Sequence, residues 1–222
     1  MSKIIELPDR IIPWIKIIYE KTNIKITNFF EIGAHLFEDA NRVKFYCNLN
    51  NKDIYCFEAS PQNFKIAVKK YPSFNSYNIG IHNIETELDF YEDSENSSDG
   101  GSNSFLKREY IHIHNPHIIK VKTITMKSFI EQNNIKNIDL CKIDVEGLTY
   151  EVLDGFKDKL NIVKVIQAEC DDVDNKDFKG CRVTSEVKEL LIKNNFEIII
   201  SKSNNFHLTP QTDILAINKE YL

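Results

Sequence analysis

An apolar strand ends in a turn of small residues at Phe29-Phe30-Glu31-Ile32-Gly33-Ala34-His35. The strand pattern spans 25–32, a helical pattern follows at 37–48, and a second β-rich run follows at 53–57. This order predicts a β-α-β unit. Small residues after its first strand would let a ligand approach the backbone, although ordinary strand-to-helix turns also use glycine.

The alternation of strand and helix patterns continues along the chain and favours a parallel sheet with helices on both faces. Asp9 is a candidate N-cap for an opening helix that runs to Thr22, and Ser185 for a helix that runs to Asn194. The other predicted helices are 61–71, 126–133 and 149–156. The other predicted strands are 74–81, 87–91, 121–123, 138–143 and 163–168.

The last two predicted strands, 196–202 and 213–218, are joined by a polar connection with no room for a crossover helix. They should therefore pair antiparallel. A mostly parallel, seven-stranded α/β sheet with an antiparallel C-terminal hairpin is the outline of the Rossmann-like class I methyltransferase fold. Ligands of such doubly wound sheets bind beyond the carboxyl ends of the strands, where the turn at Gly33 should lie.

The composition is that of one globular domain. At 222 residues the chain is long enough for a full α/β core, so we expect a single domain of this fold over 1–222 with a helical extension at 1–24. Lys and Arg are scattered and the formal net charge is -5, so nucleic acid is not an expected partner.

Two further expectations concern the cellular compartment of the protein. The five cysteines form no Cys-x-x-Cys pair, which favours reduced thiols. The apolar run 11–18 is short and contains Pro13 and Lys16, so neither a membrane span nor a signal peptide is expected. We therefore expect a soluble, cytoplasmic protein.

Glu58 follows the second predicted strand, about one β-α-β unit after Gly33. A carboxylate at this place in a dinucleotide-type fold can accept hydrogen bonds from both hydroxyls of a ribose. The alternative interpretation is a solvent-exposed loop acid or a helix cap. The spacing from Gly33 favours ribose binding.

A strongly apolar strand at 138–143 delivers three charged residues near its carboxyl end: Lys142, Asp144 and Glu146. Burying a charge is costly unless the group is paired or used. If the strand extends far enough, alternation places both acids on one face. They could orient an acceptor hydroxyl, take its proton or hold the amino group of a methyl donor, whereas a plain ion pair with Lys142 is the alternative.

Four segments of the chain, in this order, resemble the FkbM family of methyltransferases. They are Glu31-Ile32-Gly33-Ala34-His35, Phe57-Glu58-Ala59-Ser60-Pro61-Gln62-Asn63-Phe64, Asn103-Ser104-Phe105, and Lys142-Ile143-Asp144-Val145-Glu146-Gly147 with Glu151-Val152-Leu153. The match extends over about 29–169, and Phe-Glu-x-x-Pro and Lys-Ile-Asp-Val-Glu-Gly are its most specific parts. The resemblance implies methyl transfer from S-adenosylmethionine to a hydroxyl of a sugar, a glycan or a small metabolite.

The resemblance also implies roles for individual residues. The candidate cofactor-binding residues are Glu31, Gly33, Ala34, His35, Glu58, Ala59, Gly80, Ser104 and Asp144. The candidate catalytic residues are Asp144, Glu146 and Lys142, with Asp144 as the first choice.

The chain departs from the family pattern in the first turn. The family usually has Asn after Gly-Ala and another Gly two positions further, where this chain has His35 and Phe37, and Glu31 replaces a common Asp. The larger residues are expected to narrow the cofactor turn. A degenerate, non-catalytic binding module with the methyltransferase fold is therefore the alternative function. A nicotinamide-dependent oxidoreductase would need a Gly-x-Gly-x-x-Gly turn, which the chain lacks.

Other polar groups leave further alternatives open. A histidine at 112, 114 or 117 could supply an imidazole base, although such runs more often form a solvated strand edge. A set of acids could bind magnesium or calcium, or simply face water: Asp144, Glu146, Glu169, Asp171 and Asp172. The polar loop from Ser94 to Ser104 suits a hydroxylated ligand. The identity of the acceptor and the oligomeric state stay open at this point.

Overall fold

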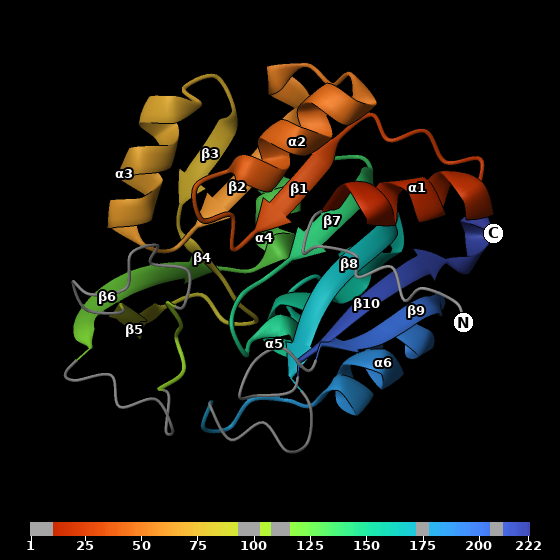
Figure 1. The fold of residues 1–222 in the computed structure, drawn as a ribbon. Coiled ribbons are helices and arrows are strands. Elements are labelled where there is room, and N and C mark those ends of the chain that lie inside the picture. Colours follow the sequence, from red (N-terminus) through yellow and green to blue (C-terminus); the bar gives the residue numbers. More distant parts are fainter. Residues whose placement is uncertain (1–10, 93–102, 108–115, 172–177, 205–210) are drawn as a thin grey trace, which may run out of the picture.

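The structure, a computed structural model, describes residues 11–92, 103–107, 116–171, 178–204 and 211–222 (Figure 1). Its strands are β1 (Phe29–Ile32), β2 (Ile54–Glu58), β3 (Asn75–Asn78), β4 (Gly80–Ile81), β5 (Glu87–Glu92), β6 (His117–Ile124), β7 (Ile138–Ile143), β8 (Val163–Asp171), β9 (Phe196–Asn204) and β10 (Gln211–Asn218). Its α-helices are α1 (Ile11–Lys21), α2 (Glu38–Cys47), α3 (Pro61–Lys70), α4 (Met126–Gln132), α5 (Thr149–Asp154) and α6 (Thr184–Lys193). Short 3-10 helices span Asn51–Asp53, Lys157–Ile162 and Lys219–Tyr221.

Seven strands form one large sheet in the order β3-β2-β1-β7-β8-β10-β9. The pairs from β3 to β8 are parallel, and β10 runs antiparallel between β8 and β9. The chain winds outward from β1 to β3 on one side and from β7 to β8 on the other, so β1 and β7 flank the switch point of the sheet. The predicted α/β fold with its antiparallel C-terminal hairpin is confirmed.

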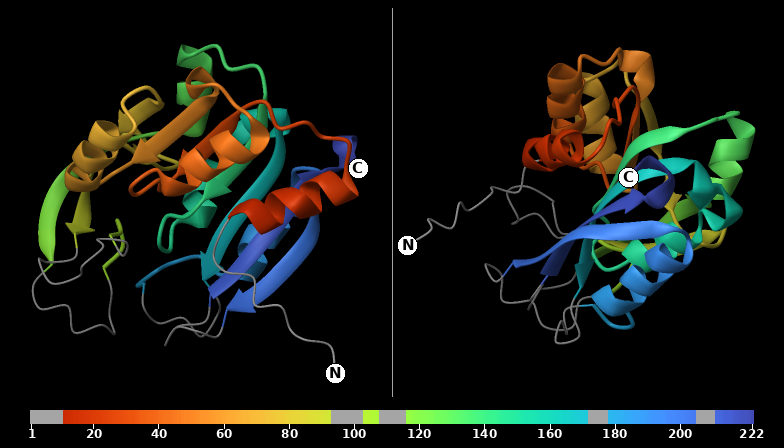
Figure 2. Two further views of the ribbon diagram at one scale, coloured as in Figure 1. Left: turned by 45° about the horizontal axis from the view of Figure 1, so that its top comes forward. Right: turned by 90° about the vertical axis from the view of Figure 1, so that its right-hand side faces the viewer.

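The large sheet carries a hydrophobic cluster on each face. Helices α1, α2 and α3 pack on one face, with Trp14 among their buried residues, and α4, α5 and α6 pack on the other, with Phe129 among theirs. Successive residues of a strand face opposite clusters, as Leu140 and Cys141 of β7 do. Figure 2 shows the helices on both sides of the sheet. Within the described ranges no helix is both long and apolar enough to cross a lipid bilayer.

A second, small sheet has three strands in the order β4-β6-β5. Strand β4 is parallel to β6, and β5 is antiparallel to β6. In Figure 1 this sheet lies at the lower left, below α3. It explains why the predicted single strand at 74–81 is wrong: β3 pairs with β2 of the large sheet, whereas β4 pairs with β6 of the small one.

Two predicted details at the ends of elements also need correction. Ser185 is not the N-cap of α6, because the helix begins at Thr184 and the N–H of Val183 donates to the carboxylate of Glu186 at 3.1 Å. Strand β1 begins only at Phe29, four residues later than the pattern predicts. The proposed cap Asp9 lies outside the described residues.

Candidate active site

A pocket of about 550 Å³, its open mouth included, lies at the carboxyl ends of β1, β2 and β7. This is the switch point at which doubly wound sheets bind their ligands. The predicted site residues that line the pocket are Gly33, His35, Glu58, Ala59, Gly80, Asp144 and Glu146.

Gly33 opens the turn after β1 in a left-handed conformation, with φ at 78°. A Cβ atom at this position would lie 1.7 Å from the carbonyl oxygen of Asp144, which directly follows β7. The N–H of Asp144 in turn donates to the carbonyl of Ile32 at 2.9 Å. Gly33 is therefore required by the neighbouring backbone, in addition to forming part of the pocket wall.

The next residues of the turn divide between the core and the pocket. Ala34 and Phe37 are 3% and 0% exposed and belong to the cluster under α1 to α3. The Phe37 ring packs edge-on against Phe64, with centroids 6.3 Å apart, and does not line the pocket. His35 and Phe37 have φ values of 48° and 59°, a region that Asn and Gly adopt more readily than other residues. The backbone thus keeps the conformation for which the Asn and Gly of the family pattern are suited, and only His35 reaches the pocket.

Glu58 ends β2 with a buried carboxylate in the pocket wall. One of its oxygens accepts the N–H of His35 at 2.7 Å, and the other accepts the N–H of Ser60 at 2.8 Å. Burial raises the pKa of Glu58 to about 7, although both hydrogen bonds oppose the shift. The lone pairs that these amides leave unused can accept hydroxyl groups from the pocket.

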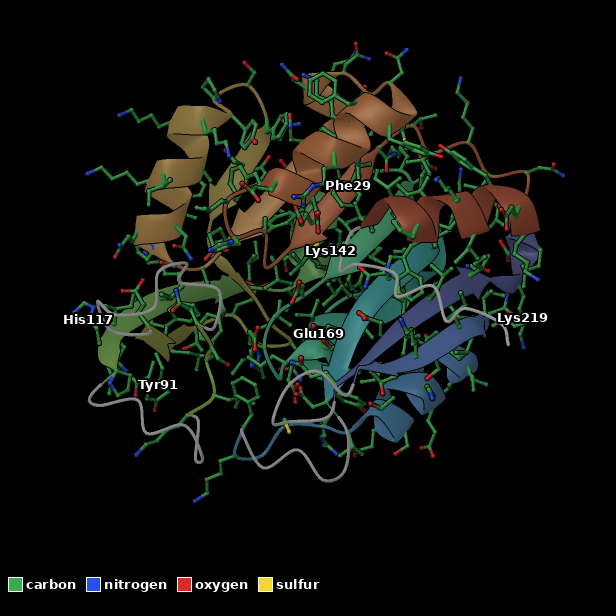
Figure 3. The ribbon with its side chains drawn as sticks, viewed as in Figure 1. Phe29, Tyr91, His117, Lys142, Glu169 and Lys219 are labelled. Carbon is green, nitrogen blue, oxygen red and sulfur yellow. The ribbon has the colours of Figure 1, made fainter. Side chains whose placement is uncertain are left out.

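Lys142 of β7, whose side chain is 13% exposed, lies in an ion-pair network beside the pocket (Figure 3). Its Nζ is 3.1 Å from Asp144 Oδ2, 3.1 Å from Asp39 Oδ2 and 3.5 Å from Glu31 Oε1. Glu31 is 2% exposed, accepts the N–H of Ala40 at 3.1 Å, and has its pKa raised to about 8 by burial. Neither Lys142 nor Glu31 lines the pocket. Together they tie the Asp144 carboxylate to the start of α2, as the ion-pair interpretation of Lys142 expects.

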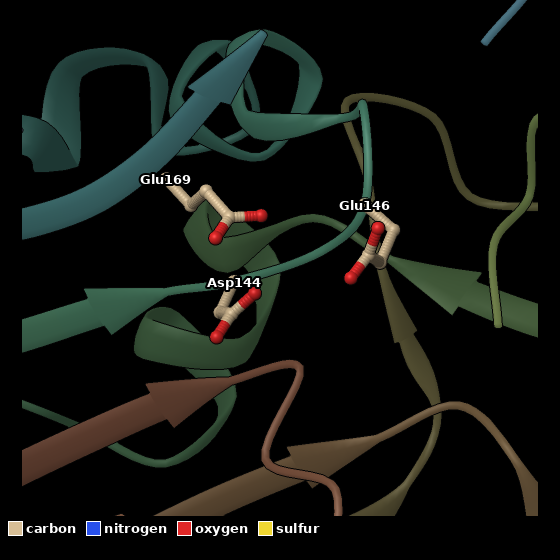
Figure 4. Close-up of side chains that lie close together, drawn as sticks. All are labelled: Asp144, Glu146 and Glu169. Carbon is tan, nitrogen blue, oxygen red and sulfur yellow. The ribbon is translucent and has the colours of Figure 1, made fainter. Parts of the chain in front are cut away.

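Asp144 and Glu146 come together for a reason other than strand alternation, because β7 already ends at Ile143. A tight turn follows, in which Glu146 has a φ of 49°. One carboxylate oxygen from each of Asp144, Glu146 and Glu169 lies within 4.8 Å of the other two. Figure 4 shows Glu169 on β8 and the two acids of the turn around one region.

The three carboxylates form a cluster whose possible ligand atoms are all oxygens. Glu169 accepts a hydrogen bond from Gln211 Nε2 at 2.8 Å. Burial and the charges of Asp144 and Glu146 raise the pKa of Glu169 well above its usual range. Such a group can accept hydrogen bonds from hydroxyls or bind a hard cation such as Mg²⁺ or Ca²⁺.

Ser104 and Gly80 support the pocket from the side of the small sheet. Ser104 is 3% exposed, and its Oγ donates to the carbonyl of Glu146 at 2.7 Å and accepts the N–H of Leu106 at 3.0 Å. A Cβ atom on Gly80 would lie 2.4 Å from the ring of Phe105. Gly80 therefore lets this ring form part of the pocket wall.

The structure adds lining residues that the predicted site lacks, among them Asn63, Ile79, Phe90, Asn103 and Phe105. Asn103 and Phe105 belong to a segment that carries the family resemblance, and this signal could have identified them. Phe90 of β5 reaches the pocket by packing against Phe105, with ring centroids 4.8 Å apart. No pattern in the sequence marks that contact, because it depends on the small sheet.

Some candidates lie elsewhere. His117 Nδ1 is 3.2 Å from Glu92 Oε2 at the end of the paired strands β5 and β6, and the His117 side chain is 71% exposed (Figure 3). Asp171 ends β8 and does not line the pocket. The residues 112, 114 and 172, and the loop from 94 up to 102, lie outside the described residues.

Solved structures of low sequence identity share this fold. A methyltransferase FkbM from Methylobacillus flagellatus aligns with a TM-score of 0.54 at 8% identity, over 86% of this chain and 44% of that chain. The magnesium protoporphyrin IX methyltransferase of Synechocystis with bound SAM aligns with a TM-score of 0.53 at 8% identity, over 94% and 77% of the chains. A S-adenosylmethionine-dependent methyltransferase of Clostridium acetobutylicum gives 0.52 at 9% identity, over 92% and 88%.

Sequence comparison gives the family. A search of curated proteins finds no significant match. The family model described as the methyltransferase FkbM domain matches residues 31–200, which is most of the chain and includes every residue that lines the pocket. The chain belongs to the FkbM-domain family of methyltransferases.

Proposed function

We propose that the protein is a S-adenosylmethionine-dependent O-methyltransferase that acts on a hydroxyl of a sugar, a glycan or a small metabolite. The observation that carries the proposal is the convergence of Glu58, Asp144 and Glu146 on one pocket at the switch point of the sheet. One carboxylate is suited to a ribose and two are suited to an acceptor hydroxyl, all within one small-molecule site.

The residues of the pocket fit S-adenosylmethionine. Glu58 offers acceptor lone pairs to two ribose hydroxyls. Gly33 has no side chain, so the cofactor can approach the backbone of the first turn at that position. Apolar residues such as Phe57 and Ile79 line the pocket and suit an adenine ring. The bound SAM of the Synechocystis enzyme supports the same cofactor here. When bound, this cofactor supplies a methyl group activated on a sulfonium.

Asp144 and Glu146 are the proposed catalytic residues. Methyl transfer is an in-line displacement, so the acceptor oxygen must be held at attack distance and aligned with the bond that breaks. A carboxylate oxygen can accept the hydroxyl hydrogen bond, orient the acceptor oxygen, and take the proton as that oxygen becomes an ether. The ion pair with Lys142 fixes the Asp144 carboxylate, which makes Asp144 the first choice and Glu146 the second.

A non-catalytic binding module is the second candidate function. The observation that favours it is His35, which lines the pocket where the family pattern has Asn. However, a module without catalysis has no need to retain converging carboxylates at three strand ends, since their mutual repulsion and burial cost free energy. We therefore favour the enzyme.

The proposal is tested by offering the purified protein isotopically methyl-labelled S-adenosylmethionine and a panel of acceptors. The panel contains monosaccharides, nucleotide sugars, oligosaccharides and small hydroxylated metabolites. We expect label on an oxygen of at least one acceptor, and a loss of about 100-fold or more in the rate with Asp144→Asn, the range for a lost general base.

The matched control is Asp158→Asn, which removes an exposed carboxylate that pairs with Lys127 at 2.7 Å outside the pocket. This variant should keep the wild-type rate. Label on nitrogen or carbon would overturn O-methylation, and a folded protein that binds no cofactor would favour the binding module.

A further inference from the structure

The turn that carries Glu146 is held by a hydroxyl from another part of the chain. Glu146 and Gly147 have φ values of 49° and 93°. A left-handed conformation is unfavourable for a residue with a Cβ atom and persists only where its surroundings hold it. At Glu146 the carbonyl oxygen receives the hydrogen bond from Ser104 Oγ at 2.7 Å.

Ser104 is itself fixed in place. Its N–H donates to the carbonyl of Tyr91 at 3.2 Å, and its carbonyl accepts the N–H of Tyr91 at 2.8 Å. Its hydroxyl also accepts the N–H of Leu106 at 3.0 Å. The neighbouring Phe105 packs against Phe90 of β5. The position of the hydroxyl is therefore set by the small sheet.

The direction of the Glu146 carboxylate depends on this turn. Glu146 lines the pocket, and its carboxylate oxygens approach those of Asp144 and Glu169 within 4.8 Å. These groups repel one another, and a relaxed turn would let the Glu146 carboxylate move away. Ser104 supplies a contact that opposes this movement, because its single O–H donor is directed at the backbone of Glu146.

We infer that Ser104 is a positioning residue, which keeps Glu146 in its left-handed conformation and so directs the Glu146 carboxylate into the pocket. The family resemblance implies cofactor binding for Ser104, whereas its 3% exposure and its hydrogen bonds favour this indirect role. The consequence of this role for the rate of methyl transfer rests on the proposed function. The effect of Ser104 on the backbone conformation of Glu146 is independent of the proposed function.

The backbone effect is tested on the full-length protein by the backbone ¹³C chemical shifts of Glu146, which report left-handed conformation. Ser104→Ala should lose the left-handed shifts, and Ser104→Thr, which keeps a hydroxyl, should retain them. The matched control is Thr123→Val in β6: Thr123 is 6% exposed, its Oγ1 donates to the carbonyl of Ile84 at 2.8 Å, and it does not line the pocket. Unchanged shifts in Ser104→Ala, or equal losses in Thr123→Val or Ser104→Thr, would overturn the inference.

The catalytic consequence is measured on an acceptor identified with the panel. Ser104→Ala should lower kcat about tenfold, as expected when one orienting hydrogen bond is lost, with the KM for S-adenosylmethionine changed by less than about twofold. Ser104→Thr should restore kcat. A lower kcat that Ser104→Thr does not restore, or an unchanged kcat in Ser104→Ala, contradicts the positioning role. If the wild type methylates no acceptor, the proposed function fails, and the chemical shifts still decide whether Ser104 holds Glu146.

Discussion

Glu58 gives a residue-scale prediction about pH. Its pKa is raised by burial to about 7, and its carboxylate must be ionised to accept two ribose hydroxyls besides the amides of His35 and Ser60. Protonation below pH 7 therefore competes with binding, and the affinity for S-adenosylhomocysteine should fall towards a limit of about tenfold per pH unit as the pH drops from 8 to 5. Calorimetric titration over this range checks the slope.

Glu58→Gln is the control for that slope. An amide can accept only one of the two N–H donors, so the variant should bind weakly at every pH in the range. An affinity of the wild type that does not change with pH would contradict a role for ionised Glu58.

Gly33 gives a second residue-scale prediction, for which Gly180 is the matched control. Both glycines have positive φ, but a Cβ atom on Gly33 would meet the Asp144 carbonyl at 1.7 Å, whereas Gly180 has nothing within 4 Å. Gly180→Ala should lower the free energy of unfolding by about 1–2 kcal/mol, from backbone strain alone. Gly33→Ala should lower the free energy of unfolding by at least about 3 kcal/mol, because the ends of β1 and β7 must also separate to make room for the methyl group. Urea denaturation compares the two, and equal losses would refute the backbone contact.

These residues mark how far the site could be predicted from sequence. Glu58 could be predicted because β-α-β spacing fixes where the second strand ends relative to Gly33. The dominant constraint on Gly33 could not, because the Asp144 carbonyl approaches it only after β1 and β7 pair. The sequence alone allows both a catalytic role and an ion pair for Lys142, because the packing of α2 decides which groups surround its ammonium.

At the scale of elements, the turn between β1 and α2 gives a prediction about the departures from the family pattern. Phe37 is fully buried against Phe64 and does not line the pocket. Phe37→Ala should lower the free energy of unfolding by about 3–5 kcal/mol through the cavity it leaves. The affinity of the folded variant for S-adenosylhomocysteine should stay within about twofold, about 0.4 kcal/mol. Denaturation and calorimetry together check this, and a larger loss of affinity would show that Phe37 contributes to the cofactor site.

The pairing of β3 and β4 explains why a single strand over 74–81 is wrong. Its β-rich pattern is continuous through Ile79, and pattern alone does not specify a hydrogen-bonding partner. The break arises because the chain leaves the large sheet after Asn78 and joins β6 from Gly80 on. The C-terminal hairpin was predicted correctly, because a short connection between two strands allows only antiparallel pairing.

At the scale of the whole molecule, we propose that the chain forms one methyltransferase domain and that α1, within the extension at 1–24, is part of its core. Ile11, Trp14, Ile15 and Ile18 of α1 are buried in the cluster that also contains residues of α2 and α3. Ile15→Ala should lower the free energy of unfolding by about 2–5 kcal/mol, and the single cooperative transition should remain. The control is Ile192→Ala, at a side chain that is 54% exposed. A separate early transition would instead indicate that α1 folds independently.

The proposed function requires above all that the protein binds the cofactor at the switch point of the sheet. The direct test is calorimetric titration of the protein at pH 8 with S-adenosylmethionine and S-adenosylhomocysteine, alongside Glu58→Ala. We expect micromolar binding of both compounds by the wild type and its collapse in the variant, with the fold intact in each. No binding by the folded wild type, or equal binding by Glu58→Ala, would contradict the proposed function.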